Sequence, residues 1–299
     1  MGPLELNYRR RGPQGSSPLP WVTMCLLVMV SRLEEAAPLV VGANRDERLD
    51  RPATAMTVLQ SAGPRILGGR DEEAGGTWLA VNEHGLVAAL TNRPASEGRD
   101  PSKRSRGELP LALACHSNAP DAVEDFLCRF DPLDYNPAWL LVGDRYSLYS
   151  LDMTGNRPVA EELPAGVHIL ENLPLGSRSP KVDHFREILG SVGGTGLKGA
   201  ALLGRLRRAL SDHSLPDKAD KDDEDAIRGQ VRSPEMLAAC VHTETYGTRS
   251  STIVRVPVRE DARIALSVAH GHPCTSPFVD AEGLWERSWP SQGNWSVCR

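Results

Sequence analysis

The stretch "VTMCLLVMV" (residues 22–30) holds the first apolar run of the chain, and a cysteine opens that run directly behind an internal methionine. A short apolar run of this kind is typical of a buried strand. The residues before it have loop composition, since an arginine run is followed by "GPQGSSPLP". We predict that residues 1–23 are a mis-called start or a disordered extension, with a targeting segment as the remaining alternative. Residues 24–299 are then one domain, and Cys25 becomes its first residue once Met24 is removed.

Further short apolar runs follow in pairs, each pair joined by a polar turn. The clearest pair, at 77–81 and 86–92, flanks "NEHG", where Gly85 supplies the positive φ that such a hairpin needs. The runs are too uniformly apolar for sheets with one face in water, so both faces should be covered. Between the runs, apolar residues recur at helical spacing over three segments: 119–130, 179–190 and 199–213. This order predicts antiparallel sheets with helices on their outer faces.

The composition narrows the functional classes. The chain has 299 residues and is 40% hydrophobic, which is enough for a sizeable core. A net charge of −5 argues against a nucleic-acid partner, and no apolar run reaches the length of a transmembrane helix. The six cysteines form no C-x-x-C pair and have no histidine at metal-site spacing, which favours a reducing cytoplasm and predicts no metal site. The acidic run at 217–230 is typical of a solvated loop. No pattern bears on the oligomeric state.

Four polar clusters interrupt the apolar runs. Any one of them could be an ordinary turn. Three place an amide, carboxylate or guanidinium at the end of a core strand, where a rigid sheet can hold polar groups over a shared cleft. Because Cys25 opens the strand next to the one that ends in the first cluster, we expect Cys25 and that cluster to be neighbours. The clusters are Asn44–Glu47, Gly75–Leu79, Thr91–Asn92 and Tyr246–Thr252.

Cys25 could carry chemistry without a histidine partner. If Met24 is removed, Cys25 has a free α-amine. An α-amine has a pKa of about 7.7–8.0 in reference peptides, so part of it is neutral at physiological pH. The amine can then act as the general base for its own thiol. A cysteine that is not a nucleophile could instead be a soft ligand or a sensor.

The motifs occur in a characteristic order: Cys directly after Met, then "NRDE", "GGTWL", "ALTN", "RGEL" and "YGTR". This ordered set resembles the NRDE family, also called the transport and Golgi organisation protein 2 family, from Met24 to the end of the chain. That family in turn resembles the N-terminal nucleophile hydrolases, particularly the choloylglycine hydrolase and penicillin V acylase branch. The resemblance implies an α+β fold, a four-layer αββα sandwich of two antiparallel sheets.

The resemblance also implies roles for five catalytic residues. Cys25 is the nucleophile and Asp46 holds its amine, while Arg249 matches the late active-site arginine of the hydrolase branch. Asn92 and Asn172 match asparagines that stabilise the tetrahedral oxyanion. Together with Asn44, these residues are expected to line one cleft, with the Asp46 carboxylate near the Cys25 nitrogen.

Further positions are expected to contribute to binding, and some depart from the family pattern. The arginine of the hydrolase branch falls on Ala43, and Arg45 is the expected replacement. Glu171 stands where a serine is usual, and Ala80 where a glycine is usual. Because neighbouring residues of a strand face opposite sides, we expect Glu171 to point away from the side that Asn172 faces. The expected binding residues are Asn44, Arg45, Glu47, Gly76, Thr77 and Trp78.

Two functions follow from these residues. The first is an amide (C–N bond) hydrolase or a related acyl-transfer enzyme, which takes a small amide or acyl substrate and needs no cofactor. The second is a non-catalytic binding or trafficking protein on the same fold, concerned with haem or acyl-lipid handling, or with secretory organisation in eukaryotic relatives. In that second reading haem would be the ligand. A free α-amine on Cys25 discriminates between them, because only the hydrolase requires it.

Overall fold

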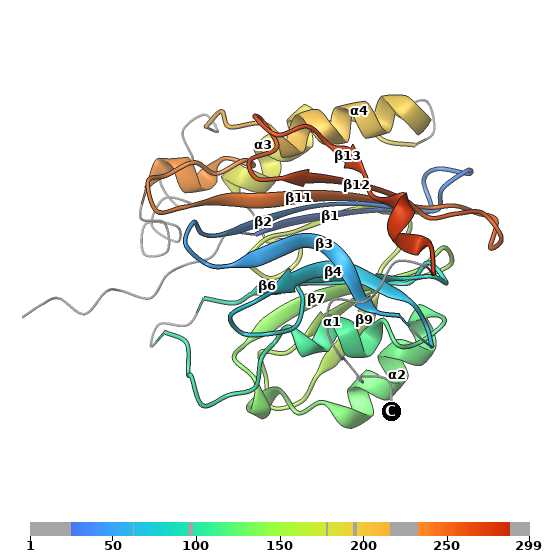
Figure 1. Cartoon of the computed structure of the whole chain (residues 1–299), viewed down its shortest axis with the longest axis vertical. Helices are drawn as coiled ribbons and strands as arrows, with labels where there is room; N and C mark the ends of the chain where they lie inside the picture. Colours follow the sequence, from blue (N-terminus) through green and yellow to red (C-terminus); the bar gives the residue numbers. More distant parts are fainter. Residues whose placement is uncertain are drawn as a thin grey trace, which may run out of the picture.

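The computed structural model describes residues 25–61, 63–94, 98–177, 179–193, 196–215 and 233–287. The expected leader at 1–23 and the acidic run at 217–230 therefore lie outside the described residues. The described chain forms two antiparallel sheets that face each other, with helices against the outer face of each sheet (Figure 1). This is the αββα sandwich that the family resemblance implies.

One sheet has six strands in the order β10-β1-β2-β11-β12-β13. Their bounds are Leu26–Ser31 (β1), Leu39–Arg48 (β2), Gly166–Leu170 (β10), Tyr246–Val256 (β11), Ala265–His270 (β12) and Val279–Asp280 (β13). Helices α3 (Pro180–Leu189) and α4 (Gly199–Leu210) cover the outer face of this sheet (Figure 1).

The other sheet has seven strands in sequential order, β3-β4-β5-β6-β7-β8-β9. Their bounds are Ala53–Gln60 (β3), Ile66–Asp71 (β4), Leu79–Asn82 (β5), Val87–Asn92 (β6), Ala138–Gly143 (β7), Leu148–Asp152 (β8) and Val159–Glu162 (β9). Helices α1 (Glu108–Leu113) and α2 (Ala119–Arg129) pack on its outer face. Three short 3-10 turns complete the described chain at Pro132–Asp134, Pro234–Leu237 and Glu282–Trp285.

The apolar strands are buried on both faces because three cores separate the four layers. In β1, Leu27 and Met29 point into the core between the two sheets, whereas Leu26 and Val28 point into the core under α3 and α4. This alternation is the ordinary geometry of a strand. It explains why the runs read as uniformly apolar in the sequence.

Strand register places Cys25 beside the end of β2. Leu26, which follows Cys25, pairs with Asn44 of β2, and Asp46 pairs with Thr248 of β11. The β2–β11 ladder shifts register between Thr248 and Ser250, as a β-bulge does. The end of β2 is therefore held between Cys25 on one side and a bulged strand on the other.

Within the described ranges, no helix combines the length and the apolar character needed to cross a membrane.

Candidate active site

A pocket of about 520 Å³ lies where the ends of β2, β4 and β6 approach the segment before α1. This volume is within the usual range for small-molecule sites. Cys25, Asp46 and Asn92 are among the residues that line it. Of the expected binding residues, Arg45, Glu47, Thr77 and Trp78 also line it, whereas Gly76 does not.

The thiol of Cys25 is half-buried at this pocket. Its Sγ lies 3.7 Å from the backbone oxygen of Asp46, to which it donates. Burial raises the pKa of the Cys25 thiol to about 12, and the negative charge of Asp46 adds to this effect. The positive charge of Arg45 acts in the opposite direction. With Cys25 as an internal residue of the chain, the thiol is therefore protonated at neutral pH.

Asp46 is fully buried, and both its carboxylate and its backbone oxygen accept hydrogen bonds. The carboxylate accepts a hydrogen bond of 2.5 Å from the Thr248 hydroxyl and lies 3.3 Å from the ammonium of Lys181 on α3. The backbone oxygen accepts from the Tyr246 hydroxyl at 2.8 Å. Burial raises the pKa of Asp46, although the Lys181 charge and the Thr248 hydroxyl both act to lower it.

Lys181 is a site residue that sequence reasoning missed. Its side chain is fully buried, which is rare for a lysine without a partner charge. The sequence places it beside Pro180 in the first turn of a helix, where a lysine usually reaches solvent. Nothing in the local pattern indicates that it turns inward toward Asp46.

The pocket wall carries an arginine–carboxylate cluster. Arg45 lies 3.1 Å from the carboxylate of Asp71, and its guanidinium sits 4.5 Å above the centre of the Trp78 ring. Arg51 binds both oxygens of Asp71, at 2.8 and 3.1 Å. Burial alone would raise the pKa of Asp71, but the hydrogen bonds from Arg51 and the two arginine charges leave it below its usual range.

Arg106 is a second residue that was not predicted as part of the site, although it belongs to the "RGEL" motif. It lines the pocket and donates to the Pro137 carbonyl at 3.1 Å. Burial, and then the neighbouring Arg99, lower the pKa of Arg106 to about 10. Arg106 is thus still a cation at neutral pH, at the same pocket as the Cys25 thiol.

Gly76 does not line the pocket, but its backbone positions the lining residues Gly75 and Thr77 on either side of it. It has a φ of +81°, and a Cβ there would lie 2.5 Å from the backbone carbon of Gly107. The next residue, Thr77, donates its N–H to the Gly107 carbonyl at 2.9 Å. Only glycine permits both the left-handed backbone and this close approach.

The ends of β6 and β10 are joined by two hydrogen bonds between the sheets. The Asn172 amide donates to the backbone oxygen of Asn92, and the Thr91 hydroxyl donates to the backbone oxygen of Glu171 at 2.9 Å. Asn172 is buried and is not among the lining residues. Asn172 therefore holds the backbone of Asn92 without reaching the pocket itself.

The expectation that six residues line one cleft is wrong for three of them. Asn44 points to the other face of β2, where its amide donates to the carbonyls of Leu210 and Ala239 at 2.9 and 2.8 Å. This follows from strand alternation, because Arg45 and Glu47 face the pocket. Asn172 supports Asn92 from behind.

Arg249 is the third exception. The bulge in β11 displaces it from the regular ladder, and its guanidinium donates to the backbone oxygens of Arg48, Leu49 and Arg51. Arg249 therefore fastens the turn between β2 and β3 instead of lining the pocket.

Glu171 points away from the pocket, as expected, but it is buried and not exposed to solvent. Burial raises the pKa of Glu171, and a hydrogen bond with Ser179 and the charge of Lys181 act in the opposite direction. The carboxyl therefore lies under the first turn of α3, near Lys181.

Several known proteins resemble this chain. The family model described as "Transport and Golgi organisation 2" matches residues 24–265. The mouse (Mus musculus) "Transport and Golgi organization 2 homolog" is 30% identical over 252 residues, which cover 75% of this chain and 83% of the relative. The Bos taurus homolog is 31% identical over 247 residues, with the same coverage.

Two solved structures show weaker likeness. A mutant of conjugated bile acid hydrolase from Clostridium perfringens has a TM-score of 0.43 at 13% identity, covering 86% of this chain and 96% of that one. The Caenorhabditis elegans ortholog of N-acylethanolamine-hydrolyzing acid amidase has a TM-score of 0.39 at 12% identity, covering 79% and 94%. It is the match over residues 24–265, together with relatives at 30–31% identity, that decides the family. The chain belongs to the transport and Golgi organisation 2 family.

Proposed function

We propose that this chain, once processed so that Cys25 is its first residue, hydrolyses an amide or transfers an acyl group through the Cys25 thiol. The observation that carries the proposal is the position of Cys25 at a pocket of small-molecule size, with its Sγ against Asp46. A small amide or acyl substrate and a cytoplasmic location are parts of the same proposal.

The thiol needs an activator, because its pKa of about 12 leaves it protonated in the unprocessed chain. Cleavage before Cys25 would create an α-amine within reach of the same thiol. The neutral amine accepts the thiol proton, and the resulting ammonium stabilises the thiolate. The buried carboxylate of Asp46 supplies a countercharge for that ammonium. The activation therefore depends on processing.

The remaining steps use the pocket wall. The thiolate attacks the carbonyl carbon of the substrate, and the negative charge moves to the carbonyl oxygen. Asn92 lines the pocket with Asn172 behind it, and Arg106 adds a positive charge near the thiol. The ammonium then gives its proton to the leaving amine, and water releases the acyl group. Loss of one oxyanion donor in such sites costs about 10²–10³ in rate.

The test compares chains that differ at the terminus and at Cys25. A chain beginning Met24-Cys25, with removal of Met24 confirmed by intact mass, is assayed against a panel of acyl amides and thioesters. It should be active, whereas the full-length chain that retains residues 1–24 should not. Cys25→Ser should keep a trace of activity, because the amine can still deprotonate a hydroxyl, and Cys25→Ala should have none. Cys128→Ser, at an exposed cysteine of α2, is the matched control and should behave like the parent.

The same proteins are titrated with haem. A chain with a confirmed Cys25 terminus that hydrolyses no amide or thioester, but binds haem and loses that binding in both Cys25 variants, would contradict the hydrolase and support the binding function.

A further inference from the structure

Two cysteines and two histidines meet beside the sheet end that carries Asp46, on two loops that are far apart in the sequence. One loop, Cys240–His242, precedes β11, and the other, His272–Cys274, follows β12. These loops adjoin because β11 and β12 are antiparallel neighbours, with Ser250 paired to His270.

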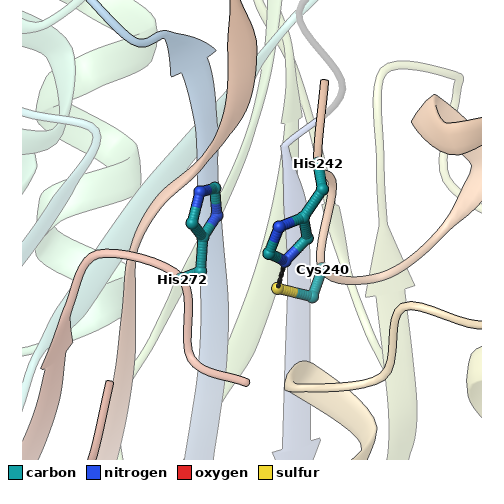
Figure 2. Close-up of side chains that lie close together, drawn as sticks. All are labelled: Cys240, His242 and His272. Atoms are coloured by element: carbon teal, nitrogen blue, oxygen red, sulfur yellow. Dashed lines mark hydrogen bonds between the residues drawn. The ribbon is translucent and has the colours of Figure 1, made fainter. Parts of the chain in front are cut away.

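Three ligand atoms of this cluster converge on one small volume, since those of Cys240, His242 and His272 all lie within 4.8 Å of one another. His242 Nε2 lies 3.3 Å from Cys240 Sγ. Cys274 is outside this group of three and reaches it through His242, with its Sγ 3.1 Å from His242 Nε2. The rings of His242 and His272 are stacked, with their centres 3.9 Å apart, and Figure 2 shows the Cys240 sulfur below the ring of His242. In a tetrahedral zinc site with bonds of about 2.0–2.3 Å, neighbouring ligand atoms are about 3.3–3.8 Å apart, so these side chains already approach that arrangement.

Hydrogen bonding alone does not satisfy the cluster. A neutral imidazole nitrogen that accepts has a single lone pair, yet two thiols stand within hydrogen-bond distance of His242 Nε2. His272 Nδ1 is buried and has no hydrogen-bond partner in the described part of the chain. Buried polar atoms without partners are rare and costly. One cation at the centre would give all these lone pairs a partner.

The side-chain types of the cluster suit a soft divalent cation. The cysteines would be bound as thiolates, and thiolate with imidazole is the ligand set that zinc prefers.

We propose that Cys240, His242, His272 and Cys274 bind one Zn²⁺ in a closed, four-coordinate site. Four protein ligands leave no open position for a substrate or water, so the metal is structural. Its effect would reach the pocket through Val241, whose N–H donates to the Thr248 hydroxyl at 2.9 Å. That hydroxyl in turn donates to the Asp46 carboxylate. Bound zinc would thus hold in place the loop Cys240–His242, which helps to orient Asp46 through Thr248.

The first experiment measures the metal in the wild-type chain, purified with reductant from cells supplied with zinc. Elemental analysis should find about one zinc per chain. Replacement by Co²⁺ should give the thiolate-to-cobalt charge-transfer absorption and the visible bands of a tetrahedral site. Reduced wild-type protein that retains neither metal, or in which peptide mapping finds Cys240 and Cys274 joined as a disulfide, would overturn the proposal.

Matched variants then assign the ligands. Cys240→Ser and His272→Gln should weaken Zn²⁺ binding by at least the roughly 10- to 100-fold that loss of an outer-shell partner costs. Cys128→Ser on α2 and His168→Gln on β10, both away from the cluster, should bind as wild type does. Unchanged cobalt spectra in Cys240→Ser would refute the assignment.

If a ligand variant fails to fold, the wild-type chain still decides the question. Removal of zinc by a chelator should lower its melting temperature, and adding Zn²⁺ back should restore it. No shift in either direction would count against the site. These readouts are independent of hydrolytic activity, so the zinc site and the proposed function can fail separately.

Discussion

The two faces of the β2 end differ in what their polar groups contact. On the inner face, Arg45 and Glu47 line the pocket among other charged side chains. On the outer face, the side chains of Asn44 and Asp46 are buried under the helical layer, where they bind backbone carbonyls, a hydroxyl and Lys181, and Asp46 also lines the pocket. Adjacent residues of one motif therefore differ in whether their side chains face the pocket or are held by buried partners. Substitutions that remove buried partners should mainly lower stability, and those on the inner face should mainly change what the pocket binds.

The largest effect is expected from Asp46→Ala on the outer face. The substitution leaves the Lys181 ammonium buried without its carboxylate and the Thr248 hydroxyl without its acceptor. Removing one partner of a buried ion pair costs about 3–5 kcal/mol. Urea denaturation should show a loss of this size in the free energy of unfolding.

The double variant Asp46→Ala/Lys181→Met sharpens that prediction. It removes both charges and replaces the lysine by an apolar chain of similar length, so it should be more stable than Asp46→Ala alone. If the loss in the free energy of unfolding of the double variant equals the sum of the losses in the two single variants, the broken ion pair does not explain the instability of Asp46→Ala.

An intermediate loss of stability is expected from a substitution on the outer face, Asn44→Ala, and it should exceed the loss from a substitution on the pocket face, Glu47→Ala. Asn44→Ala removes the donor for the carbonyls of Leu210 and Ala239, and unsatisfied buried groups cost about 1–3 kcal/mol. Glu47→Ala, on the pocket face, removes the acceptor of the Arg48 N–H and a 3.8 Å ion pair with Arg51, so it should cost less, about 0.5–1 kcal/mol. Equal losses in the two variants would show that the faces are not distinct.

A smaller, pH-dependent effect is expected from Asp71→Asn. The folded pKa of Asp71 is lowered, so its contribution to stability is complete above its unfolded pKa of about 3.9 and is lost as the pH falls through the folded pKa. Asp71→Asn should therefore be less stable than wild type at pH 7 by about 1 kcal/mol, and the difference should shrink toward pH 3. Chemical denaturation at several pH values measures this, and a difference that stays constant with pH would be the contrary result.

The smallest effect on stability is expected from Arg106→Gln. Burial disfavours the charged form of this guanidinium, and in the described residues it forms no ion pair, so removing the charge should alter the free energy of unfolding by less than about 1 kcal/mol. Acyl-amide hydrolysis should nevertheless fall at least about 10-fold, since a positive charge near the reacting thiol is lost. Arg129→Gln, on the surface of α2, is the control.

Much of the sandwich could be predicted because its signals are local. The hairpin at Gly85 has the expected positive φ of +91°, and the helices α2, α3 and α4 lie within the predicted segments. The closeness of Cys25 and Asp46 could be predicted because the first two strands were expected to pair. Strands β3 and β4 were missed, since the threonines of β3 and the paired glycines of β4 weaken the apolar pattern.

The site was harder to predict because it depends on orientation. A one-residue difference along β2 separates Arg45 in the pocket from Asn44 on the opposite face. Arg249 was misplaced because a bulge cannot be read from the sequence of one strand. Cys240 and Cys274 gave no metal signal, since the spacing rule compares near neighbours and their histidines come together only across the β11–β12 hairpin.

The two hydrogen bonds between the ends of β6 and β10 have a mechanical consequence. Because Thr91 and Asn172 each reach across to the backbone of the other sheet, the two sheets are cross-linked next to the pocket. Separation of the sheets at this end would break both bonds, so a change in pocket width costs least at the rim at residues 98–107 and at the lining side chains.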